Sequence, residues 1–373
     1  MKILQTPARF YPYIGGVENN AYYLSLELLK RGHDVTVICA NEPDAKDLTN
    51  VNGIRVQRLK YIGKIANTNI TLRLPFALRK TEFDLVHTHL PTPWSADWST
   101  MVARRKKKPV VLTYHNDITG SGMARYIARL YNATSLNYIL KHVDRIIITQ
   151  PGYLHSSPYL KRVEHKIVII PNGVDVEKFK PPNDANHASN VLFFLSILDE
   201  FHRYKGLDIL LKALTIVKKD IPDIKLIVGG EGELRGEYQQ MATSLGLNGT
   251  VEFHGFIPDD RLVEYYTTSN AFVLPSISST QEGFGLVLLE ALACGTPVIS
   301  TDIVGVAADV KASNAGIIVS PNDPEALAEA ILTLLRDAAL ASKMGESGRR
   351  LVEAKYTWER VAAMTEEVYE ALL

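Results

Sequence analysis

Two glutamates eight residues apart stand at the most informative point of the chain. Glu282 lies in a polar, glycine-containing loop, and Glu290 lies in the apolar segment that follows. The loop comes after residues 271–275, an apolar run typical of a buried parallel strand, and before residues 286–293, which are expected to form a helix. A helix N-terminus presents free backbone N–H groups and the positive end of its dipole. The loop therefore suits a phosphate.

The carboxylate of Glu290 needs a partner, because a charge inside an apolar helix is costly unless it is hydrogen-bonded. A ribose diol is one such partner, as in other α/β nucleotide sites. A cap or pairing with a nearby backbone group is another. The spacing alone leaves both roles open.

Glycine or polar residues also follow several other predicted strands, where ligands approach an open α/β sheet. Gly15 and Gly16 would let backbone N–H groups approach an anion, although a plain turn explains them too. His115 ends a strand and precedes polar residues, so it is placed to hydrogen-bond a sugar hydroxyl. His87 and His89 flank another strand end, where ligand contact and burial in the core are both open.

Two further strand–helix junctions carry charge or glycine. Residues 199–206 place cations before a helix, where the dipole disfavours them. A bound pyrophosphate would resolve this conflict at Lys205, and solvent exposure of its ammonium group is the alternative. Gly230 lies in the glycine-rich stretch 229–233, which either meets a ligand or is simply a turn.

Composition sets limits on the class of protein. The chain has 373 residues, of which 46% are apolar and 22% charged, as in a globular protein of two domains. Residues 1–170 contain 24 Lys and Arg against 12 Asp and Glu, whereas residues 171–373 contain 17 against 29. This asymmetry indicates different partners for the two halves. Two isolated cysteines provide no disulfide framework, and neither a signal-peptide pattern nor a membrane-spanning run is found, so a cytoplasmic location is expected.

Strand-like runs alternate with helical segments along the chain, which predicts doubly wound parallel sheets. A turn-rich and proline-rich segment, residues 171–190, separates two such series and is interpreted as a linker. We therefore predict an α/β fold with two open domains whose strand ends face a crevice. The last helices are expected at residues 324–336, 340–355 and 358–372.

Together these motifs resemble the retaining nucleotide-sugar glycosyltransferases of the GT-B fold, of the family 4 type (glycosyl transferase group 1). The glutamate pair is the most specific element, because its flanking sequence matches as well. The resemblance implies a Rossmann-like acceptor domain at residues 1–170 and a Rossmann-like donor domain at 171–355. It also implies a final helix, about residues 356–373, that packs back on the first domain. The matched elements are residues 12–18, 114–116, 170–175, 205–206, 230–232 and 282–299.

The resemblance implies a role for each matching residue. His115 would contact the donor sugar near its reacting centre, Lys205 would neutralise charge on the leaving diphosphate, and Glu282 would bind hydroxyls of the transferred sugar. Glu290 would hold the ribose diol. The other implied donor contacts are Gly15 and Gly16 near the pyrophosphate, Phe256 and Ile257 near the base, and the backbone around Gly283, Phe284, Gly285 and Leu286. Gly230 is a further implied contact.

The chain departs from the family at one point. Such enzymes often carry a Gly-Arg-Leu run after the first strand of the second domain, and its Arg joins the Lys at the diphosphate. Here the run is Ser196-Ile197-Leu198. We expect His202 or Arg203 to supply the missing positive charge, and the sequence leaves the choice open.

The expected chemistry is the transfer of a sugar from a nucleotide sugar to a glycan or lipid-linked acceptor, without a cofactor. Helix N-termini and Lys205 would stabilise the leaving diphosphate, and no metal-ligand spacing is found, so no metal is expected. Retention of anomeric configuration is implied by the resemblance only. Two alternatives remain: a GT-B-like sugar-phosphate synthase or epimerase with a soluble substrate, and a non-catalytic nucleotide-sugar-binding protein.

The partners follow from the same argument. The donor is expected to be a UDP-, GDP- or ADP-sugar, and no nucleic acid partner is expected. Residues 104–108, Arg-Arg-Lys-Lys-Lys, either form a solvated helix end or contact an anionic membrane surface, with residues 69–80 beside them. The second interpretation predicts a peripheral protein at the inner face of the cell membrane.

Overall fold

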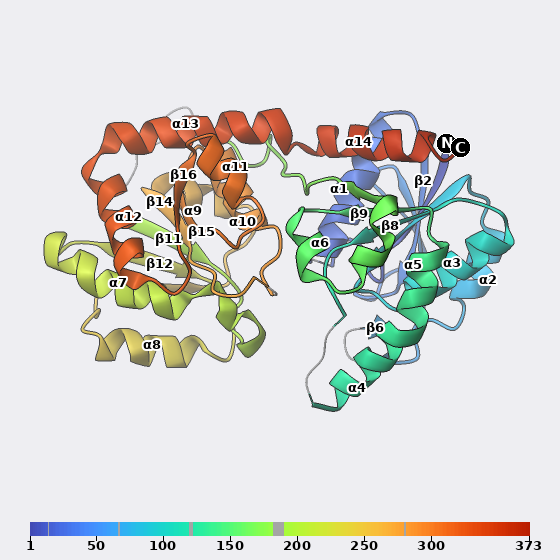
Figure 1. Ribbon diagram of the computed structural model, residues 1–373, viewed down its shortest axis with the longest axis horizontal. Helices are drawn as coiled ribbons and strands as arrows, with labels where there is room; N and C mark the ends of the chain where they lie inside the picture. Colours follow the sequence, from blue (N-terminus) through green and yellow to red (C-terminus); the bar gives the residue numbers. More distant parts are fainter. Residues whose placement is uncertain (14, 66–67, 119–121, 182–189, 280) are drawn as a thin grey trace. The chain divides into compact units, whose positions relative to one another are not determined.

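The computed structural model describes residues 1–13, 15–65, 68–118, 122–181, 190–279 and 281–373 (Figure 1). The fold divides into two units. The first unit comprises Met1–Asn172 and Trp358–Leu373, and the second comprises Gly173–Thr357. The sequence-based boundary after residue 170 lies two residues before the division. Residues 182–189 of the expected linker lie outside the described residues.

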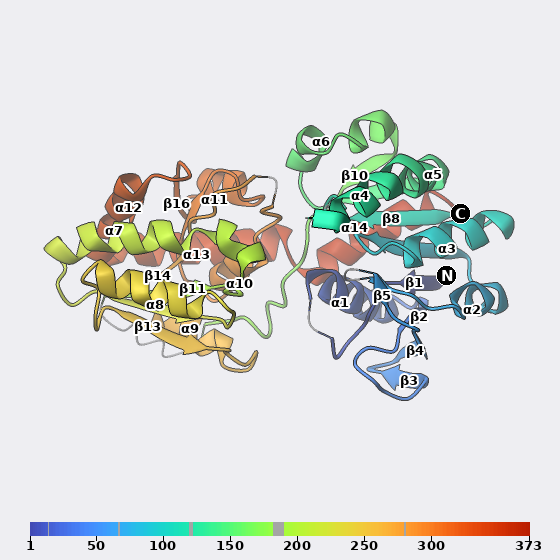
Figure 2. The ribbon, with the colours of Figure 1, turned by 90° about the horizontal axis from the view of Figure 1, so that it is seen from below.

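One large sheet forms the centre of the first unit. Within the described residues its eight strands are, in order, β10 (Ile167–Ile169), β9 (Arg145–Ile148), β8 (Val110–Tyr114), β7 (Leu85–Leu90), β1 (Lys2–Thr6), β2 (Asp34–Ala40), β4 (Ile54–Leu59) and β3 (Leu48–Val51). All neighbours are parallel except β3, which runs antiparallel to β4 at the sheet edge (Figure 2). A separate short hairpin joins β5 (Lys64–Ile65) and β6 (Thr68–Asn69).

Helices cover both faces of this sheet. They are α1 (Gly16–Lys30), α2 (Leu74–Lys80), α3 (Ser95–Arg105), α4 (Gly122–Tyr131), the π-helical η1 (Asn132–Leu136), α5 (Asn137–His142), α6 (Gly152–Ser156), the 3₁₀ helix η2 (Leu160–Lys166) and α14 (Trp358–Glu370).

Successive residues of a strand point to opposite faces, so each strand feeds two cores. Ile3 packs with the side chains of α1 and α14, whereas Leu4 packs with those of α2, α3 and α5. Trp358 and Tyr369 of α14 are buried in the first of these cores, which explains why the last helix belongs to the first unit.

The helical pattern of residues 123–142 predicts a single helix, but the structure has three consecutive helical segments there, α4, η1 and α5. The wider π turn changes the phase of the helix and lets Asn132 and Leu136 both face inward. The buried amide of Asn132 donates to the Ile118 carbonyl at 2.9 Å and to the Tyr159 hydroxyl at 3.0 Å. The amide nitrogen of this inward-facing residue is therefore satisfied, whereas its buried Oδ1 has no hydrogen-bond partner among the described residues.

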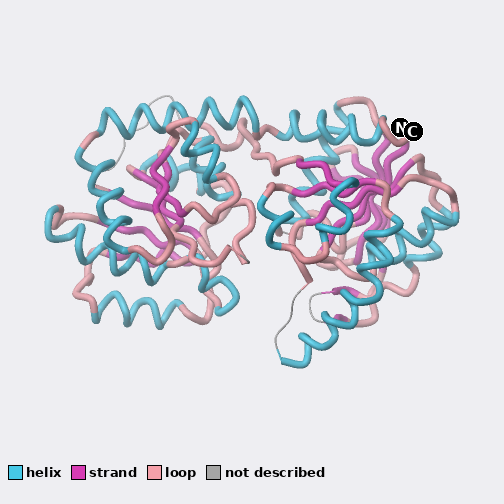
Figure 3. The backbone as a smooth tube through the Cα atoms, in the orientation of Figure 1, coloured by secondary structure: helices cyan, strands magenta, loops and turns pink. Residues whose placement is uncertain are grey.

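The second unit is a doubly wound parallel sheet with helices outside it (Figure 3). Its strands, in order, are β13 (Val251–Gly255), β12 (Lys225–Gly229), β11 (Val191–Leu195), β14 (Ala271–Leu274), β15 (Val298–Thr301) and β16 (Gly316–Val319). Its helices are η3 (Glu200–Lys205), α7 (Leu207–Asp220), α8 (Arg235–Ser244), α9 (Leu262–Thr268), α10 (Leu286–Ala293), α11 (Ala307–Ala312), α12 (Pro324–Arg336) and α13 (Ala338–Lys355).

The chain reverses its direction of travel across the second sheet between β11 and β14. It proceeds from β11 outward to β13, and then returns to the centre and proceeds outward from β14 to β16. Such a switch point opens a crevice at the carboxyl ends of the two central strands. The predicted doubly wound α/β architecture is confirmed.

Candidate active site

An ion pair joins the two loops that leave the central strands of the second unit. Lys205 ends η3, which follows β11, and Glu282 lies in the loop that follows β14. The Lys205 ammonium nitrogen is 2.9 and 3.0 Å from the two carboxylate oxygens of Glu282. The Glu282 side chain is only 2% exposed, whereas that of Lys205 is 16% exposed. The cation is thus the more accessible member of the pair.

Glu282 is held by several donors besides Lys205. The Ser276 hydroxyl donates to Oε2, and the Gly283 backbone N–H donates to Oε1 at 3.0 Å. A buried carboxylate with this many donors is fixed in position. Sequence reasoning missed Ser276, although its place two residues after β14 was a usable signal.

Gly206 allows the two loops to approach each other. Its φ is +77°, and a Cβ there would lie 2.1 Å from the Pro275 carbonyl oxygen. Next to this contact, the Ile277 N–H of the second loop donates to the Tyr204 carbonyl of the first at 2.8 Å. The glycine therefore permits the contact that brings Lys205 to Glu282.

Glu290 lies on α10 and is partly buried. Its Oε2 accepts a hydrogen bond from the Tyr266 hydroxyl at 2.8 Å. Burial raises the pKa of Glu290 to about 7, and the hydrogen bond from Tyr266 opposes that rise. Glu290 thus has a partner within the protein, and this partner is a side chain rather than the nearby backbone group that the sequence left open beside the ribose diol.

Gly230 and Gly232 hold the loop after β12 against the loop after β11. A Cβ on Gly230 would lie 1.7 Å from the Ser196 carbonyl oxygen, and one on Gly232 would lie 2.1 Å from that of Leu198. The Leu198 N–H in turn donates to the Glu231 carbonyl at 2.9 Å. Close backbone packing therefore explains these glycines without a ligand.

Three histidine rings line the carboxyl edge of the first sheet, and we call them the histidine ladder. His87 and His89 lie on β7 and His115 follows β8. Neighbouring rings are stacked, with centroids 4.8 Å apart for His87 and His89 and 5.6 Å apart for His89 and His115. His87 and His89 are fully buried. Burial lowers the pKa of His87 to about 3 and that of His115 to about 4, so the ladder is neutral at neutral pH.

Gln5 fixes the hydrogen-bond direction along this ladder. Its Oε1, which can only accept, is 3.1 Å from Nε2 of His89, so that nitrogen carries the proton. The Nδ1 of the neutral His89 then accepts from Nε2 of His115, 3.3 Å away. Gln5 was not singled out from the sequence.

The last helix reaches the same ladder. The Tyr369 hydroxyl of α14 lies 2.6 Å from Nδ1 of His87, and Nε2 of His87 lies 2.7 Å from the Thr113 hydroxyl. Tyr369 is 282 residues from His87, so no local sequence signal links them.

Both units match known families. The description "Glycosyltransferase Family 4" covers residues 14–178, and "Glycosyl transferases group 1" covers residues 175–351. The O-antigen chain mannosyltransferase C of Escherichia coli is 30% identical over 100% of this chain and 99% of its own length. This chain belongs to the family 4 glycosyltransferases. The phosphatidyl-myo-inositol mannosyltransferase of Mycobacterium leprae is 28% identical over 96% of this chain and 93% of its own.

Solved structures place this glycosyltransferase in the GT-B fold. The sucrose-phosphate synthase of Thermosynechococcus elongatus superposes with a TM-score of 0.76 at 26% identity, covering 100% of this chain and 98% of that one. The HepE protein of Anabaena, solved with UDP-glucose, superposes with a TM-score of 0.74 at 20% identity over 100% of both chains. The predicted family, fold and enzyme class are confirmed.

The glycosyltransferase holds both candidates for the missing arginine in ion pairs. The Arg203 guanidinium contacts Glu200 and Glu237, with Nη1 2.8 Å from Glu237 and Nη2 2.9 Å from Glu200. Nδ1 of His202 is 2.6 Å from Asp199. Arg203 therefore already neutralises acidic neighbours, and the His202 ring is already bound to one.

Three apolar residues of the predicted donor site differ in what they present. The Phe256 ring is 70% exposed after β13, so it offers a face for stacking on a base. The side chains of Ile257 and Phe284 are buried in the core of the second unit. Ile257 and Phe284 can therefore reach a ligand only through their backbone. Gly285, with φ +85°, directly precedes α10, whose first N–H groups, starting at Leu286, have no partner within the helix.

Gly15 and Gly16 begin α1 beside a buried ion pair that the sequence analysis did not assign. Arg9 Nε lies 3.1 Å from Glu18, and both side chains are at most 6% exposed. A Cβ on Gly15 would lie 2.4 Å from Glu18 Oε2, whereas Gly16 has open space. Ile14, which precedes these glycines, lies outside the described residues.

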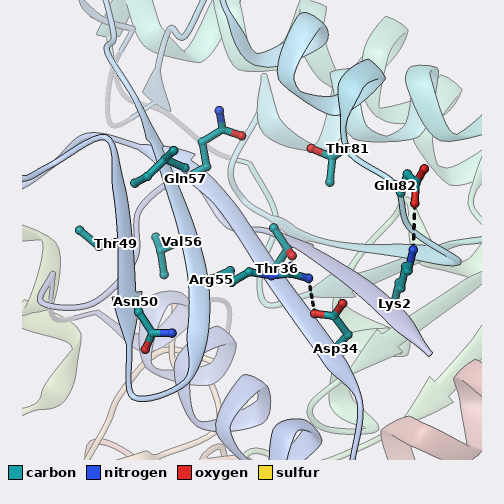
Figure 4. A pocket seen from close by; sticks show the side chains of 11 residues that line it. Lys2, Asp34, Thr36, Thr49, Asn50, Arg55, Val56, Gln57, Thr81 and Glu82 are labelled. Carbon is teal, nitrogen blue, oxygen red and sulfur yellow. Dashed lines mark hydrogen bonds and ion pairs between the residues drawn. The ribbon is translucent and has the colours of Figure 1, made fainter.

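A cavity of about 550 Å³ lies at the opposite end of the first sheet, at the start of the strands (Figure 4). Ion pairs cross its wall, between Lys2 and Glu82 at 2.8 Å and between Arg55 and Asp34. None of the predicted site residues lines it. Ligands of open α/β sheets approach the carboxyl ends instead, so we do not assign the donor to this cavity.

Within the described residues, no group of three His, Cys, Asp or Glu side chains is arranged to hold a metal ion. No helix of the described chain is both long and apolar enough to cross a membrane.

Proposed function

We propose that this glycosyltransferase moves a sugar from a nucleotide-sugar donor to a glycan or lipid-linked acceptor with retention of configuration and without a metal ion. The observation that carries the donor assignment is the Lys205–Glu282 ion pair at the switch point of the second sheet. A cation there, next to the N-terminus of α10, suits a diphosphate. Glu290 lies about one turn into α10 and suits the ribose diol.

The proposed reaction balances without a cofactor. The bond between the anomeric carbon and the diphosphate oxygen breaks, and the acceptor hydroxyl oxygen bonds to that carbon. The hydroxyl proton passes to an oxygen of the leaving nucleoside diphosphate. Lys205 stabilises the negative charge that develops there, and Glu282 orients hydroxyls of the transferred sugar.

His115 supports sugar recognition in this proposal. With its Nε2–H directed to His89, its Nδ1 is left as the acceptor for a sugar hydroxyl. A neutral imidazole orients the sugar without adding positive charge next to an oxocarbenium-like transition state. The ladder behind it keeps that ring in place.

The names of relatives support the acceptor class. The relatives include an O-antigen chain mannosyltransferase and a phosphatidyl-myo-inositol mannosyltransferase, whose names point to a glycan and a lipid. The HepE structure contains UDP-glucose, which supports a nucleotide-sugar donor but leaves the base of this protein's donor open.

A two-step experiment tests the proposal. Melting temperatures are measured with UDP, GDP and ADP, because a ligand of the native state stabilises it. The sugar nucleotides of the stabilising base are then assayed for transfer, and the anomer of the product is read by NMR. We expect one base to stabilise the protein and the product to keep the donor's anomeric configuration. If none of the three changes the melting temperature, the donor assignment fails.

A soluble acceptor is the second candidate function. The similarity to a sucrose-phosphate synthase, at 26% identity over the whole chain, favours it. Transfer to a sugar phosphate in the assay, with none to glycan or lipid-linked acceptors, would select this alternative. Binding of a nucleotide sugar without turnover would instead indicate a non-catalytic binder.

A further inference from the structure

Helix α4 presents an apolar surface that no described part of the first unit covers. Tyr126, Ile127 and Leu130 are 66, 55 and 68% exposed. Their spacing places them side by side on one face of the helix, while Ala128 on the other face is buried. Figure 1 shows α4 extending beyond the rest of the first unit. Contiguous exposed apolar side chains of this size mark a contact surface.

The charges beside this face have one sign. Arg125 and Arg129, one turn apart, are both exposed along its edge. Residues 118–143 contain no Asp or Glu at all. A second copy of the chain would bring these arginines together with no carboxylate from this segment to pair with them. An anionic surface is the complementary partner.

The position of α4 in the fold distinguishes it from the basic run at residues 104–108. Both flank β8, whose strand runs from Val110 to Tyr114. The basic run precedes the strand, whereas α4 follows it, on the side of the sheet where the chain passes His115. A lipid contact at α4 is therefore at the carboxyl edge, together with the proposed sugar-binding residue.

The basic run is also less available than its sequence indicates. Arg104 Nη1 contacts Asp144 at 3.1 Å, and Lys108 lies 3.8 Å from Asp84. Lys106 donates to the Thr81 carbonyl at 2.6 Å and lies over the Phe83 ring. Three of its five cations are thus engaged inside the first unit.

We propose that α4 is the surface by which the protein lies on an anionic lipid bilayer, with Tyr126, Ile127 and Leu130 in the interface and Arg125 and Arg129 on the head groups. Amphipathic helices with basic edges and aromatic side chains bind membranes in this way. The inference rests on the proposed function, because it explains how a lipid-linked acceptor reaches the carboxyl edge of the first sheet.

Vesicle sedimentation with two matched double variants tests the location. R125Q/R129Q removes two exposed charges from α4, and R105Q/K107Q removes two exposed charges from the basic run. Wild type is expected to sediment with phosphatidylglycerol-containing vesicles at low salt, not with pure phosphatidylcholine, and to be released at high salt. At about 1 kcal/mol for each arginine, R125Q/R129Q should weaken binding about 30-fold. R105Q/K107Q should change it less than about three-fold, because at most a small part of that run is near the bilayer.

A third variant and a fluorescent one test the apolar contact. Y126S/I127S/L130S should lose vesicle binding while keeping the wild-type melting temperature. Y126W should show a blue shift of tryptophan emission on addition of anionic vesicles, relative to the wild-type background from its own tryptophans.

The outcomes separate this proposal from the proposed function. Nucleoside diphosphate binding is measured on wild type and on the same variants. The proposed donor site does not involve α4, so a wild type that binds no nucleoside diphosphate would count against the donor site alone. The membrane proposal is overturned if wild type ignores anionic vesicles at low salt, or if R105Q/K107Q loses binding as strongly as R125Q/R129Q. A concentration-dependent dimer in light scattering that Y126S/I127S/L130S dissolves would assign the face to a second copy instead.

Discussion

The carboxyl edges of the two sheets are built from different chemistry. The first carries the histidine ladder, which is stacked, buried and neutral because burial lowers the pKa of each ring. The second carries the Lys205–Glu282 ion pair. The first edge thus offers directional hydrogen bonds without net charge, and the second offers a fixed cation. In the proposed reaction, the neutral edge supplies a sugar contact through His115, whereas the charged edge supplies the diphosphate contact through Lys205 and a sugar contact through Glu282.

The two edges also depend on pH in opposite directions. The ladder histidines have lowered pKa values, so their contribution to stability is present above about pH 6.5 and is lost as the pH falls toward 4 and then 3. Glu290 has a raised pKa, so its contribution is present below about pH 4.5 and is lost as the pH rises through 7. Acid therefore weakens the first edge. A rise through neutral pH instead deprotonates Glu290 in the second unit and removes its contribution to stability.

The largest expected effect comes from removing the cation of the charged edge. K205A should lower kcat about 100-fold or more, because a preorganised group that stabilises developing charge is lost and Glu282 is left buried without its counterion. Initial rates at saturating donor measure this. R203A is the control, since Arg203 is bound to Glu200 and Glu237, and it should stay within about three-fold of wild type. A K205A enzyme with normal kcat would remove the charge asymmetry between the edges.

A smaller effect is expected from the titration of Glu290. Ribose hydroxyls donate to the ionised carboxylate, so nucleotide affinity should be about ten-fold higher at pH 8 than at pH 6 for a carboxyl with pKa near 7. Isothermal titration calorimetry at several pH values measures it. E290Q should flatten this profile. It should also be more stable than wild type above pH 7, because the variant lacks the buried charge that wild-type Glu290 carries at that pH. A pH profile identical in E290Q and wild type would show that the diphosphate's own titration explains the effect.

Removing the support behind His115 should cost less, because the reacting group itself remains. H89Q should lower kcat about five- to ten-fold with a small change in the KM for donor, since the ring of His115 remains but loses the partner that fixes its orientation and tautomer. Nitrogen NMR of His115 is the decisive readout: wild type should show the Nε2–H tautomer, and H89Q a mixture. A wild-type His115 protonated on Nδ1 would contradict the direction that we assign from Gln5.

The smallest expected effect is none. Incubation with EDTA should leave turnover unchanged, because the ion pair and helix N-terminus supply the positive charge in the proposed mechanism. Rates before and after chelation, with magnesium added back, test this. Complete loss of activity that magnesium restores would place a metal at the charged edge.

The sequence predicted well those elements whose ends are marked by local chemistry. The helix at residues 324–336 was predicted with its observed ends, since Asp323 caps it and Pro324 begins it. The same holds for residues 286–293, which follow Gly285 in a left-handed conformation. Strand β3 and the β5–β6 hairpin were not predicted, because their short polar segments lack an apolar period.

The site could be predicted only as far as each residue's own loop. Lys205, Glu282 and His115 were each assigned to a strand end, but their roles remain predictions. Partners far along the chain were out of reach: Glu237 holds Arg203 from 34 residues away, and Tyr266 holds Glu290 from 24. Those contacts arise when the sheet brings neighbouring strands together, and nothing in the local pattern encodes them.

The return of the chain to the first unit affects how the protein is made. A ribosome releases the N-terminal segment first, yet part of one face of its sheet is covered by Trp358, Val361 and Tyr369 of the last helix. The apolar surface under the last helix therefore stays exposed in the nascent first unit until the whole second unit has been translated. A chain terminated before Trp358 would carry a complete second unit and an unfinished first one, whose His87 lacks the Tyr369 hydroxyl. Such premature products are natural substrates for chaperones and proteases, even though they retain every residue of the proposed donor site.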